Sequence, residues 1–491
     1  MTNDIPKDPD HTLNRTFRLK ELSELFFEET GKRIDDYAIL HRQQSSPRRR
    51  VRLKSGTDVL IGTWNPLAEQ NSAFVYLAEH LGRYGVHVPK VVATGGNGQL
   101  LLEEDLGDTS LYSLFAEKRT TTDLFPRVIE EWYERTIDAL VLMQVKPVAD
   151  LDFNRCYPTP AFDRQFVQWD LNYFKYNFLN LVGIPYNAFS LERDFLSFTD
   201  LILAAPCSYF MHRDFQSRNI MIKDNLPYII DFQDGRRGPI HFDLTSLLYQ
   251  PSVAIPEVAR ARLVEYYCNK MSVYLTFDRA EFKKTLSIFT FFRLFAASGT
   301  YGLRGIHERN PYFIKSITPA AQSLRSLLTT PGLPARLPEL ERVLNSYVER
   351  FANPQRTERN RLLVRISSFS YAGGVPPAED EHGGGFVFDC RLLPNPGRDP
   401  AHAERTGLDK EVIQYLEIEP EVATFLSHVT SLVDASVNRY VSRKFSSLAV
   451  NFGCTGGRHR SVYCAEQIAA HLRLRGDIDV SVRHRTIGDT R

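Results

Sequence analysis

The apolar residues near the start of the chain change from helical spacing to short strand-like runs. Leucine and phenylalanine side chains recur at helical spacing between residues 19 and 26, and Gly31 follows them, which predicts a short amphipathic helix. Short apolar runs then predict three strands between residues 36 and 63. The next elements expected are a helix over 66–83 and strands over 88–92 and 100–107.

Two longer stretches, 122–204 and 256–350, have mostly helical spacing. The first contains aromatic residues at helical intervals, among them Phe162, Phe166, Trp169 and Tyr173. We interpret this aromatic stripe as core packing rather than as a ligand-binding box. The second stretch is interrupted by turns predicted around 299–302 and 331–334, where glycine and proline gather.

A change in composition divides the chain. Residues 353–361 are charged and poor in apolar side chains, which predicts a linker. Strand signals resume beyond it, with loops rich in glycine and proline between them. A chain of 491 residues is too long for one ordinary core, so we expect a domain over 1–352 and a smaller one over 362–491.

The bulk composition is typical of a globular protein, with 43% hydrophobic and 24% charged residues. A net charge of +1 argues against a globally basic nucleic-acid binder, although a local basic patch remains compatible with it. No apolar stretch approaches the ~20 residues that span a bilayer, and the first residues lack the features of a secretion signal. The six cysteines include no CxxC pair, so we expect a reduced, cytoplasmic protein. The lack of a long apolar stretch leads us to expect no membrane partners.

The strongest chemical signal is the sequence His-Arg-Asp-Phe-Gln-Ser-Arg-Asn over residues 212–219, followed by Asp231. Phosphoryl transfer needs a base for the acceptor hydroxyl and oxygen ligands for Mg²⁺. The spacing assigns Asp214 as the base and Asn219 and Asp231 as the metal ligands. Apolar runs on either side of the turn at residues 223–225 predict a hairpin that brings Asn219 and Asp231 to one end. The alternative is a solvated loop followed by an ordinary buried hairpin.

A second candidate site is the loop of small and basic residues before the strand at residues 51–53. Ser45, Ser46, Arg48 and Arg50 can surround phosphates with backbone N–H groups and guanidinium groups. The same composition is also common in surface turns, and that alternative stays open.

A third candidate lies in the glycine-rich turn over 453–461. A buried strand is predicted before it and a helix, ended by Gly476, after it. Backbone N–H groups at a helix start, together with basic side chains, suit a phosphate. Cys454 and Arg460 also satisfy the Cys-x5-Arg loop of cysteine phosphatases, in which cations stabilise a thiolate. Because no general acid is identifiable, we favour binding over that catalysis, and a plain surface turn is the remaining alternative.

Residues 35–350 resemble the aminoglycoside phosphotransferase and choline kinase superfamily, most of all the bacterial N-acetylmuramate/N-acetylglucosamine kinases. The matching segments are 45–49, 102–108, 212–219 with Asp231, and 243–248. The resemblance implies a protein-kinase-like bilobal fold and an ATP- and Mg²⁺-dependent transfer to a hydroxyl. It also implies that adenine is lined by Leu102–Leu106, including Glu103, Glu104 and Leu106. One departure is the third strand, Leu60–Thr63, which lacks the usual lysine, so Arg48, Arg50 and Lys54 are candidate substitutes.

Residues 362–491 resemble the C-terminal domain of RapZ, the RNase adapter protein. Four motifs match in the same order, over 386–396, 406–410, 453–461 and 483–486, whereas the Walker A loop of that family is absent. The resemblance implies a small α/β domain that senses glucosamine-6-phosphate and binds small RNAs. The phosphosugar residues so implied are Arg391, Cys454, Thr455, Gly456, Gly457, Arg458, His459, Arg460, Ser461, His484 and Arg485. Basic residues outnumber acidic ones from 439 onward, but a basic tail is missing and aromatic platforms are sparse, so we expect phosphosugar binding rather than RNA binding.

Together these observations predict an α+β protein of two domains, a kinase-like one followed by a RapZ-like one. The expected activity is transfer of phosphate from ATP to a sugar or amino sugar, with Mg²⁺ as cofactor and a sugar phosphate bound at the C-terminal domain. The alternative is a regulatory adapter, in which the kinase-like half is inactive and the other half binds RNA or a protein.

Overall fold

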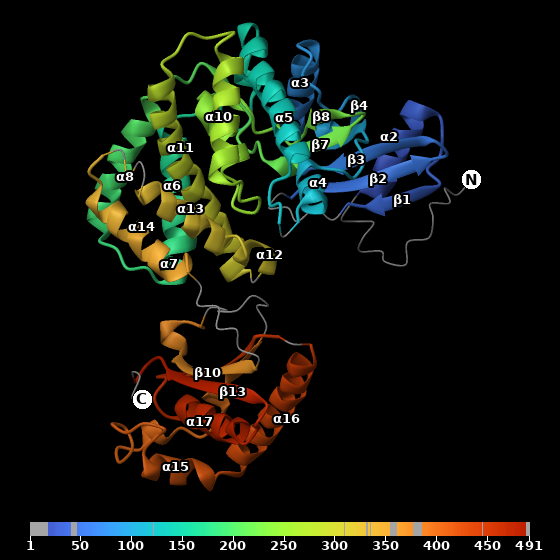
Figure 1. The fold of residues 1–491 in the computed structure, drawn as a ribbon. Helices are drawn as coiled ribbons and strands as arrows, with labels where there is room; N and C mark the ends of the chain where they lie inside the picture. The colour runs from blue at the N-terminus through green and yellow to red at the C-terminus, as the bar shows by residue number, and fades with distance from the viewer. Residues whose placement is uncertain are drawn as a thin grey trace. The chain divides into compact units, whose positions relative to one another are not determined.

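The computed structural model describes residues 18–40, 47–120, 122–308, 310–329, 332–333, 335–353, 361–376, 385–443 and 445–487 (Figure 1). The chain forms two compact units. The first comprises Met1–Tyr173, Tyr186–Ala297 and Pro319–Val348, and the second Phe174–Pro185, Ser298–Thr318 and Glu349–Arg491. Most of the predicted linker, 354–360, lies outside the described residues, so the domain boundaries stay a prediction.

The first unit begins with an antiparallel five-stranded sheet in the order β1-β2-β3-β5-β4. Helix α2 packs its apolar residues, Leu22 and Phe26 among them, against the sheet residues Leu53 and Leu102. Helix α3 places Phe74 and Leu77 in the main core of the unit instead. The bounds are α2 Leu19–Thr30, β1 Asp36–Ile39, β2 Arg49–Ser55, β3 Asp58–Trp64, α3 Ala68–Arg83, β4 Val91–Gly95 and β5 Leu100–Glu104. The helices and strands predicted for this part of the chain are thus confirmed, except that the strand expected over 88–92 lies at Val91–Gly95 and the one expected over 100–107 ends at Glu104.

A mostly helical region follows. Two small antiparallel sheets interrupt it, β6 with β9 and the hairpin β7 with β8. The helices are α4 Leu111–Lys118, α5 Arg127–Val145, α6 Arg164–Phe174, α7 Asn180–Val182, α8 Ala188–Leu203, α9 Ile240–Leu248, α10 Glu257–Met271, α11 Arg279–Thr300, α12 Pro311–Ile314, α13 Ile317–Thr329 and α14 Pro338–Phe351. The strands are β6 Tyr209–Met211, β7 Ile220–Lys223, β8 Leu226–Ile229 and β9 Arg236–Gly238.

The turn predicted around residues 299–302 is wrong. Helix α11 runs without interruption into a π-helix, Tyr301–His307. A Cβ atom on Gly302 would lie 1.7 Å from the carbonyl oxygen of Asn177, which belongs to a second π-helix, Lys175–Leu179. The glycine therefore permits a close approach of two helical backbones. The other predicted turn, 331–334, lies partly outside the described residues.

The last part of the chain forms a parallel four-stranded sheet in the order β11-β12-β10-β13. Its core contains alternating residues of the central strands, such as Val364 and Ile366 on β10 and Val450 and Phe452 on β12. The bounds are β10 Leu362–Ser370, β11 Gly385–Asp389, α15 Lys410–Glu417, α16 Pro420–Ser442, β12 Ser447–Cys454, α17 Arg460–Arg473 and β13 Ile478–His484.

Throughout the described part of the chain, every helix is too short or too polar to cross a lipid bilayer. All six cysteines are free thiols.

Candidate functional site

The hairpin brings two of the predicted site residues together. Ile220 pairs with Ile229, and the N–H of Ile230 donates to the carbonyl oxygen of Asn219 over 3.0 Å. Asn219 and Asp231 therefore stand at the same end of β7 and β8, as predicted. Asp231 adopts a φ of +66°, which is uncommon for a residue other than glycine.

The carboxylate of Asp214 is oriented by three side chains. Its Oδ2 accepts from Gln216 Nε2 at 2.9 Å and from Asn219 Nδ2 at 3.0 Å. Its Oδ1 accepts from Arg293 Nη2 at 3.3 Å, while 46% of the Asp214 side chain stays exposed. A carboxylate that is held in place and still accessible suits a base that receives a proton from a bound hydroxyl.

A buried carboxylate shapes the loop that carries Asp214. Asp243 Oδ2 accepts from the backbone N–H of His212 at 2.7 Å, and its Oδ1 accepts from that of Arg213 at 2.9 Å. Burial raises the pKa of Asp243 to about 6, although these hydrogen bonds oppose the shift. Arg213 has a φ of +79°, a conformation that costs on the order of 1–3 kcal/mol and needs support from its surroundings. Asp243 supplies that support.

Asn219 and Asp231 fit a magnesium site. Asn219 uses its amide nitrogen toward Asp214, so its carbonyl oxygen is the atom that can face a cation. Mg²⁺ prefers oxygen ligands and is commonly held by one or two carboxylates together with substrate phosphates. Within the described ranges, no cluster of three or more His, Cys, Asp or Glu side chains forms a metal site. Asn219 and Asp231 can therefore offer two oxygens to an ion whose other ligands are phosphates.

Two arginines contact Asp231, one just before β2 and one on it. Arg48 Nη1 and Arg50 Nη2 donate to Asp231 Oδ1 over 3.3 and 3.1 Å. Arg50 pairs with Thr63 of β3, and the Thr63 hydroxyl donates to Glu103 over 3.3 Å. Both arginines and Glu103 are buried. Lys54, the other candidate substitute, instead pairs with Asp36 at the surface.

Electrostatics ties this cluster together. Burial raises the pKa of the Glu103 carboxyl, against the opposing effect of Arg50 and Arg48. Burial likewise lowers the pKa of Arg48, whereas Asp231 and Glu103 outweigh burial at Arg50 and raise its pKa. Two buried guanidinium groups thus lie beside Asp231 and Glu103.

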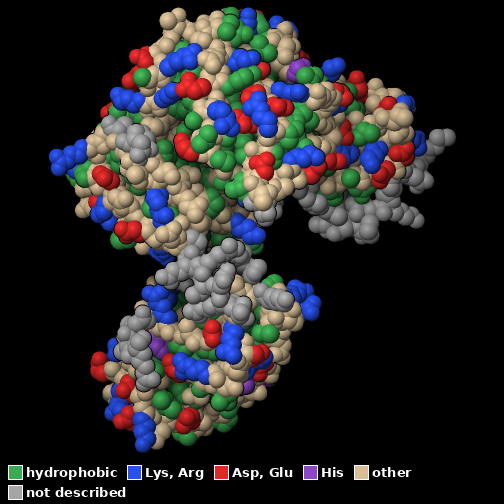
Figure 2. Space-filling model, viewed as in Figure 1, with side chains coloured by type: hydrophobic (Ala, Val, Ile, Leu, Met, Phe, Trp, Pro, Cys, Tyr) green, Lys and Arg blue, Asp and Glu red, His purple; other side chains and the backbone are tan. Residues whose placement is uncertain are grey.

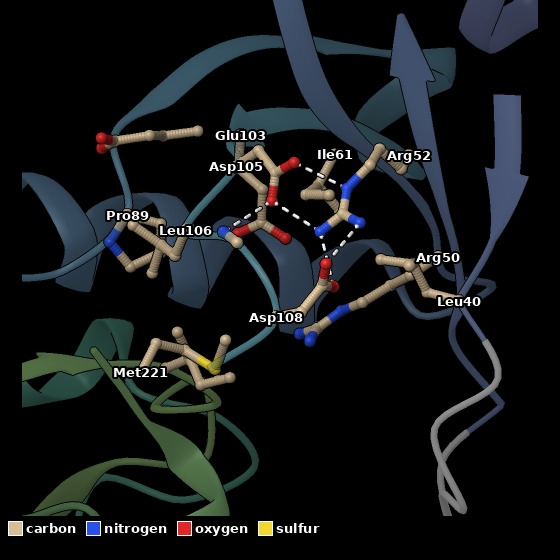
Figure 3. Close-up of a pocket in the computed structure, with 13 residues that line it drawn as sticks. Leu40, Arg50, Arg52, Ile61, Pro89, Glu103, Asp105, Leu106, Asp108 and Met221 are labelled. Carbon is tan, nitrogen blue, oxygen red and sulfur yellow. Dashed lines mark hydrogen bonds and ion pairs between the residues drawn. The ribbon is translucent and has the colours of Figure 1, made fainter. Parts of the chain in front are cut away.

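A cleft of about 750 Å³, open to solvent, lies beside this cluster (Figure 3). Its lining combines apolar with charged side chains: Leu40, Arg50, Arg52, Ile61, Pro89, Glu103, Glu104, Asp105, Leu106, Gly107, Asp108, Met221 and Ile230. Arg52 holds one side of it through ion pairs with Asp105 at 2.6 Å and Asp108 at 2.9 Å. The apolar residues, Met221 and Ile230 among them, suit a flat aromatic base.

Most of the residues predicted to bind nucleotide gather at this place. Arg50, Glu103, Glu104 and Leu106 line the cleft, and Arg48 joins them through Asp231. Ser45 and Ser46 lie outside the described residues. The sequence reasoning missed Arg293, because it lies 79 residues beyond Asp214 and no local pattern marks it. Asp243 belongs to a segment that matches the kinase superfamily, but the sequence analysis assigned it no role. A carboxylate near the start of a buried helix could have indicated one.

The glycine-rich turn joins the carboxyl end of β12 to the start of α17, as predicted. Cys454 Sγ lies 3.1 Å from the hydroxyl of Ser461, and both residues are buried. Gly457 has a φ of +68°, and an added Cβ would lie 2.3 Å from Thr486 Oγ1, so only glycine fits here. The backbone thus forms a tight concave turn at a helix start, which suits an anion.

The basic side chains of the turn contact backbone carbonyl groups. Arg460 Nη1 donates to the carbonyl oxygens of Arg391 and Leu393 over 2.9 and 3.0 Å. Arg458 donates to the carbonyl oxygen of Glu404, and a ring nitrogen of His459 lies 3.0 Å from the carbonyl oxygen of His402. With Arg460 engaged in this way and Cys454 buried beside Ser461, the geometry favours a binding loop over a phosphatase loop.

The remaining predicted phosphosugar residues have partners of their own. The Arg391 side chain pairs with Asp389 at 2.6 Å and lies over the ring of Tyr371 at 3.9 Å. His484 is buried on β13 and contacts Ser368 and Glu466 through its two ring nitrogens. The N–H of Arg485 donates to the carbonyl oxygen of Ser368. Thr455 and Gly456 are exposed on the turn itself.

Comparisons with known proteins give two family matches. Residues 40–283 match the phosphotransferase enzyme family, and residues 362–488 match the RapZ C-terminal domain. A nucleotide-binding protein of Xylella fastidiosa (strain M23) is 41% identical over 131 residues, which is 27% of this chain and 43% of that protein. A nucleotide-binding protein of Gluconobacter oxydans (strain 621H) is 32% identical over 253 residues, 50% of this chain and 71% of that protein. The chain thus spans less than half the length of several curated relatives that it matches.

Solved structures with a similar fold include choline kinase LicA from Streptococcus pneumoniae, with a TM-score of 0.43 and 13% identity. That match covers 63% of this chain and 99% of that one. Another is a thermostable mutant of aminoglycoside phosphotransferase APH(4)-Ia, with a TM-score of 0.41 and 10% identity, covering 63% of this chain and 100% of that one.

The predicted fold, a kinase-like part followed by a smaller α/β domain, is confirmed by the family matches and by the parallel C-terminal sheet. The chain carries a domain over residues 40–283 that matches the phosphotransferase enzyme family, followed over residues 362–488 by one that matches the RapZ C-terminal domain.

Proposed function

We propose that this protein transfers the γ-phosphate of ATP to a hydroxyl of a sugar or amino sugar, with Mg²⁺ as cofactor. One observation carries the proposal: Asp214, Asn219 and Asp231 meet at one place, next to a cleft that suits a nucleotide. A base, two oxygen ligands for a cation and a nearby nucleotide cleft are what phosphoryl transfer requires.

In the proposed reaction Asp214 receives the proton of the acceptor hydroxyl through its carboxylate. The hydroxyl oxygen forms a bond to the γ-phosphorus while the bond from that phosphorus to the bridging oxygen breaks, and ADP leaves. Arg293, 3.3 Å from Asp214, provides positive charge where the transferred group passes. Mg²⁺, held by Asn219 and Asp231, would neutralise the charge of the phosphates.

The proposed nucleotide site uses the cleft of Figure 3. Leu106, with Glu103 and Glu104, would line the adenine, and Arg48 and Arg50 would turn toward the phosphates when Asp231 takes up the cation. Guanidinium groups suit this role because they keep their charge when buried and bind oxyanions through two parallel hydrogen bonds. Ser45 and Ser46 stay part of the proposed phosphate loop.

The acceptor class rests on the resemblance of residues 35–350 to the N-acetylmuramate/N-acetylglucosamine kinases. The RapZ C-terminal domain points in the same direction. We propose that this domain binds a sugar phosphate such as glucosamine-6-phosphate at residues 454–461, with Arg391, His484 and Arg485 nearby. Calorimetry should show binding of glucosamine-6-phosphate and not of glucosamine, and Thr455→Ala should weaken it. Equal affinity for both sugars would contradict a phosphate site.

Coupling between the two activities is a hypothesis of the same proposal. The C-terminal domain would report sugar phosphate levels to the kinase. Saturating glucosamine-6-phosphate should change the rate of phosphoryl transfer, and unchanged kinetics would contradict the coupling. The free thiols and the use of ATP suit a cytoplasmic protein, which we propose as its location.

The deciding experiment incubates the protein with Mg²⁺ and γ-labelled ATP against a panel of sugars and amino sugars. Transfer that depends on one sugar and is lost in Asp214→Asn would support the kinase. No transfer to any sugar, from a folded protein that binds nucleotide, would contradict it.

A second candidate function is the regulatory adapter with an inactive kinase-like half. The observation that favours it is the absence of a lysine from the third strand. Asp231 is bound by two arginines instead. On the face visible in Figure 2, basic and acidic side chains of the C-terminal α/β domain are interspersed, so that face offers no continuous basic surface for RNA. Gel shifts with small RNAs that weaken steeply with salt would support the adapter.

A further inference from the structure

The aromatic stripe on α6 is only partly a core feature. Phe162, just before the helix, is buried as predicted, but 56% of Trp169 is exposed, so the interpretation of Trp169 as core is wrong. The rings of Trp169 and Tyr173 are stacked, with centroids 5.2 Å apart and planes 12° apart. Helical spacing places these residues on one side of α6, but it does not say whether that side is covered.

This aromatic pair, of which Trp169 is exposed and Tyr173 partly buried, is connected to the catalytic loop. The guanidinium of Arg213, the residue directly before Asp214, lies 4.4 Å from the ring of Phe166 and 5.9 Å from that of Trp169. Arg213 Nη2 also lies 3.4 Å from a carboxylate oxygen of Asp170, which is buried on the same helix. The strained backbone of Arg213, held by Asp243, thus fixes both the base and the guanidinium that touches the aromatic side chains.

The chemistry of these groups fits a carbohydrate. A pyranose ring has an apolar face of C–H groups that stacks on flat aromatic rings, and its hydroxyls need charged or polar partners at the edge. Trp169 and Tyr173 provide the flat surface. Arg213, with 28% of its side chain exposed, provides donors beside Trp169, and the buried Asp170 holds its guanidinium in place.

We propose that Trp169 and Tyr173 form a shelf on which the sugar ring of the acceptor stacks, with Arg213, which Asp170 holds in place, binding its hydroxyl groups. This inference rests on the proposed kinase function and locates the acceptor site within it. The Arg213 guanidinium beside the shelf favours a neutral pyranose over an alkyl ammonium compound, because it would repel a cation.

The first test uses binding without turnover. The chain has three tryptophans, so the sugars of the panel are titrated against the intact protein without nucleotide while its tryptophan fluorescence is recorded. A saturable change that is lost in Trp169→Ala and retained in Phe189→Ala supports the shelf. Phe189 is a matched control because it is an aromatic residue on another helix, α8, with 81% of its surface exposed. Absence of any sugar-dependent change, or a change retained in Trp169→Ala, overturns the shelf.

The second test separates the shelf from the kinase. For an active enzyme, Trp169→Ala and Tyr173→Ala should each raise the KM for the sugar about tenfold or more and leave kcat within about threefold, with unchanged affinity for ATP. Trp169→Phe should retain most of the affinity. A KM unchanged in both alanine variants overturns the shelf and leaves the kinase intact. Sugar binding that depends on Trp169 in a protein without transferase activity supports the shelf and contradicts the kinase.

Discussion

Under the proposed function Arg293 is expected to provide positive charge beside Asp214, in addition to Mg²⁺ and the arginines near Asp231. Its Nη2 lies 3.3 Å from Asp214 Oδ1, and its Nε donates to the Ser246 hydroxyl over 3.0 Å, which fixes the guanidinium. The residue two positions after Asp214 is Gln216, which has no charge to offer. Replacing Arg293 by methionine should therefore slow phosphoryl transfer and leave the cleft that binds ATP unchanged.

The size of the effect is estimated from the loss of one preorganised donor. At 3.3 Å the attraction between the Arg293 guanidinium and the Asp214 carboxylate is about 5 kcal/mol at an effective dielectric constant of ~20, which keeps the guanidinium beside the base. Solvent reduces this value, because 21% of the Arg293 side chain and 46% of that of Asp214 are exposed. Removal of one preorganised donor from a transition state typically costs about 3–4 kcal/mol. We expect kcat to fall about 100- to 1000-fold in Arg293→Met.

The assay measures single turnovers with γ-labelled ATP and the active sugar, alongside the affinity for ATP. Arg293→Lys keeps the charge and should retain more activity than Arg293→Met. Arg279→Met is the matched control on the same helix, about 21 Å away along its axis, where an exposed ion pair with Glu265 is lost. A kcat for Arg293→Met within about threefold of the wild type would refute the reasoning. Equal losses of kcat and of ATP affinity would assign Arg293 a structural role.

Three other perturbations test the surrounding structure. Burial lowers the pKa of His241 to about 3, so on acidification this histidine is protonated in the unfolded chain at a higher pH than in the folded one. The free energy of unfolding should therefore fall by about 2 kcal/mol between pH 7 and pH 5. Urea unfolding at both pH values should show a smaller loss in His241→Phe. Gly302→Ala should destabilise the protein by about 2 kcal/mol or more, since its Cβ would lie 1.7 Å from a carbonyl oxygen. Gly82→Ala in α3, with open space around it, should raise the melting temperature instead. Arg50→Met should weaken MgATP binding about tenfold, and Lys54→Met, at the exposed pair with Asp36, should leave it unchanged.

The parts of the site that are close in sequence could be predicted because their geometry is local. Asn219 and Asp231 lie on either side of a short hairpin, so the spacing alone brings them together. The turn between β12 and α17 is equally local, and its glycines identify it. The strands and the first helices followed from the spacing of apolar residues for the same reason.

The missed features all depend on distant parts of the chain. Arg293 reaches Asp214 across 79 residues, and only packing of α11 brings them together. Helical spacing marked Trp169 as part of one face, but whether other elements cover that face is not encoded in the spacing. Gly302 was interpreted as a turn because glycine is permissive in turns, whereas here it makes room for another backbone.

The two arginines that contact Asp231 bear on the choice between an enzyme and an inactive adapter. In the structure Arg48 and Arg50 share one oxygen of Asp231, and Glu103 is buried beside them, so the carboxylates balance the guanidinium charges. If Asp231 turns to a cation that arrives with ATP, this balance changes, and the two guanidinium groups need new anionic partners. Under the proposed function, the phosphates of the same nucleotide would be those partners. A buried lysine could lose its proton in such a site, but an arginine stays charged. The arginines would then replace the lysine that the third strand lacks. This reasoning favours the active kinase over the inactive adapter.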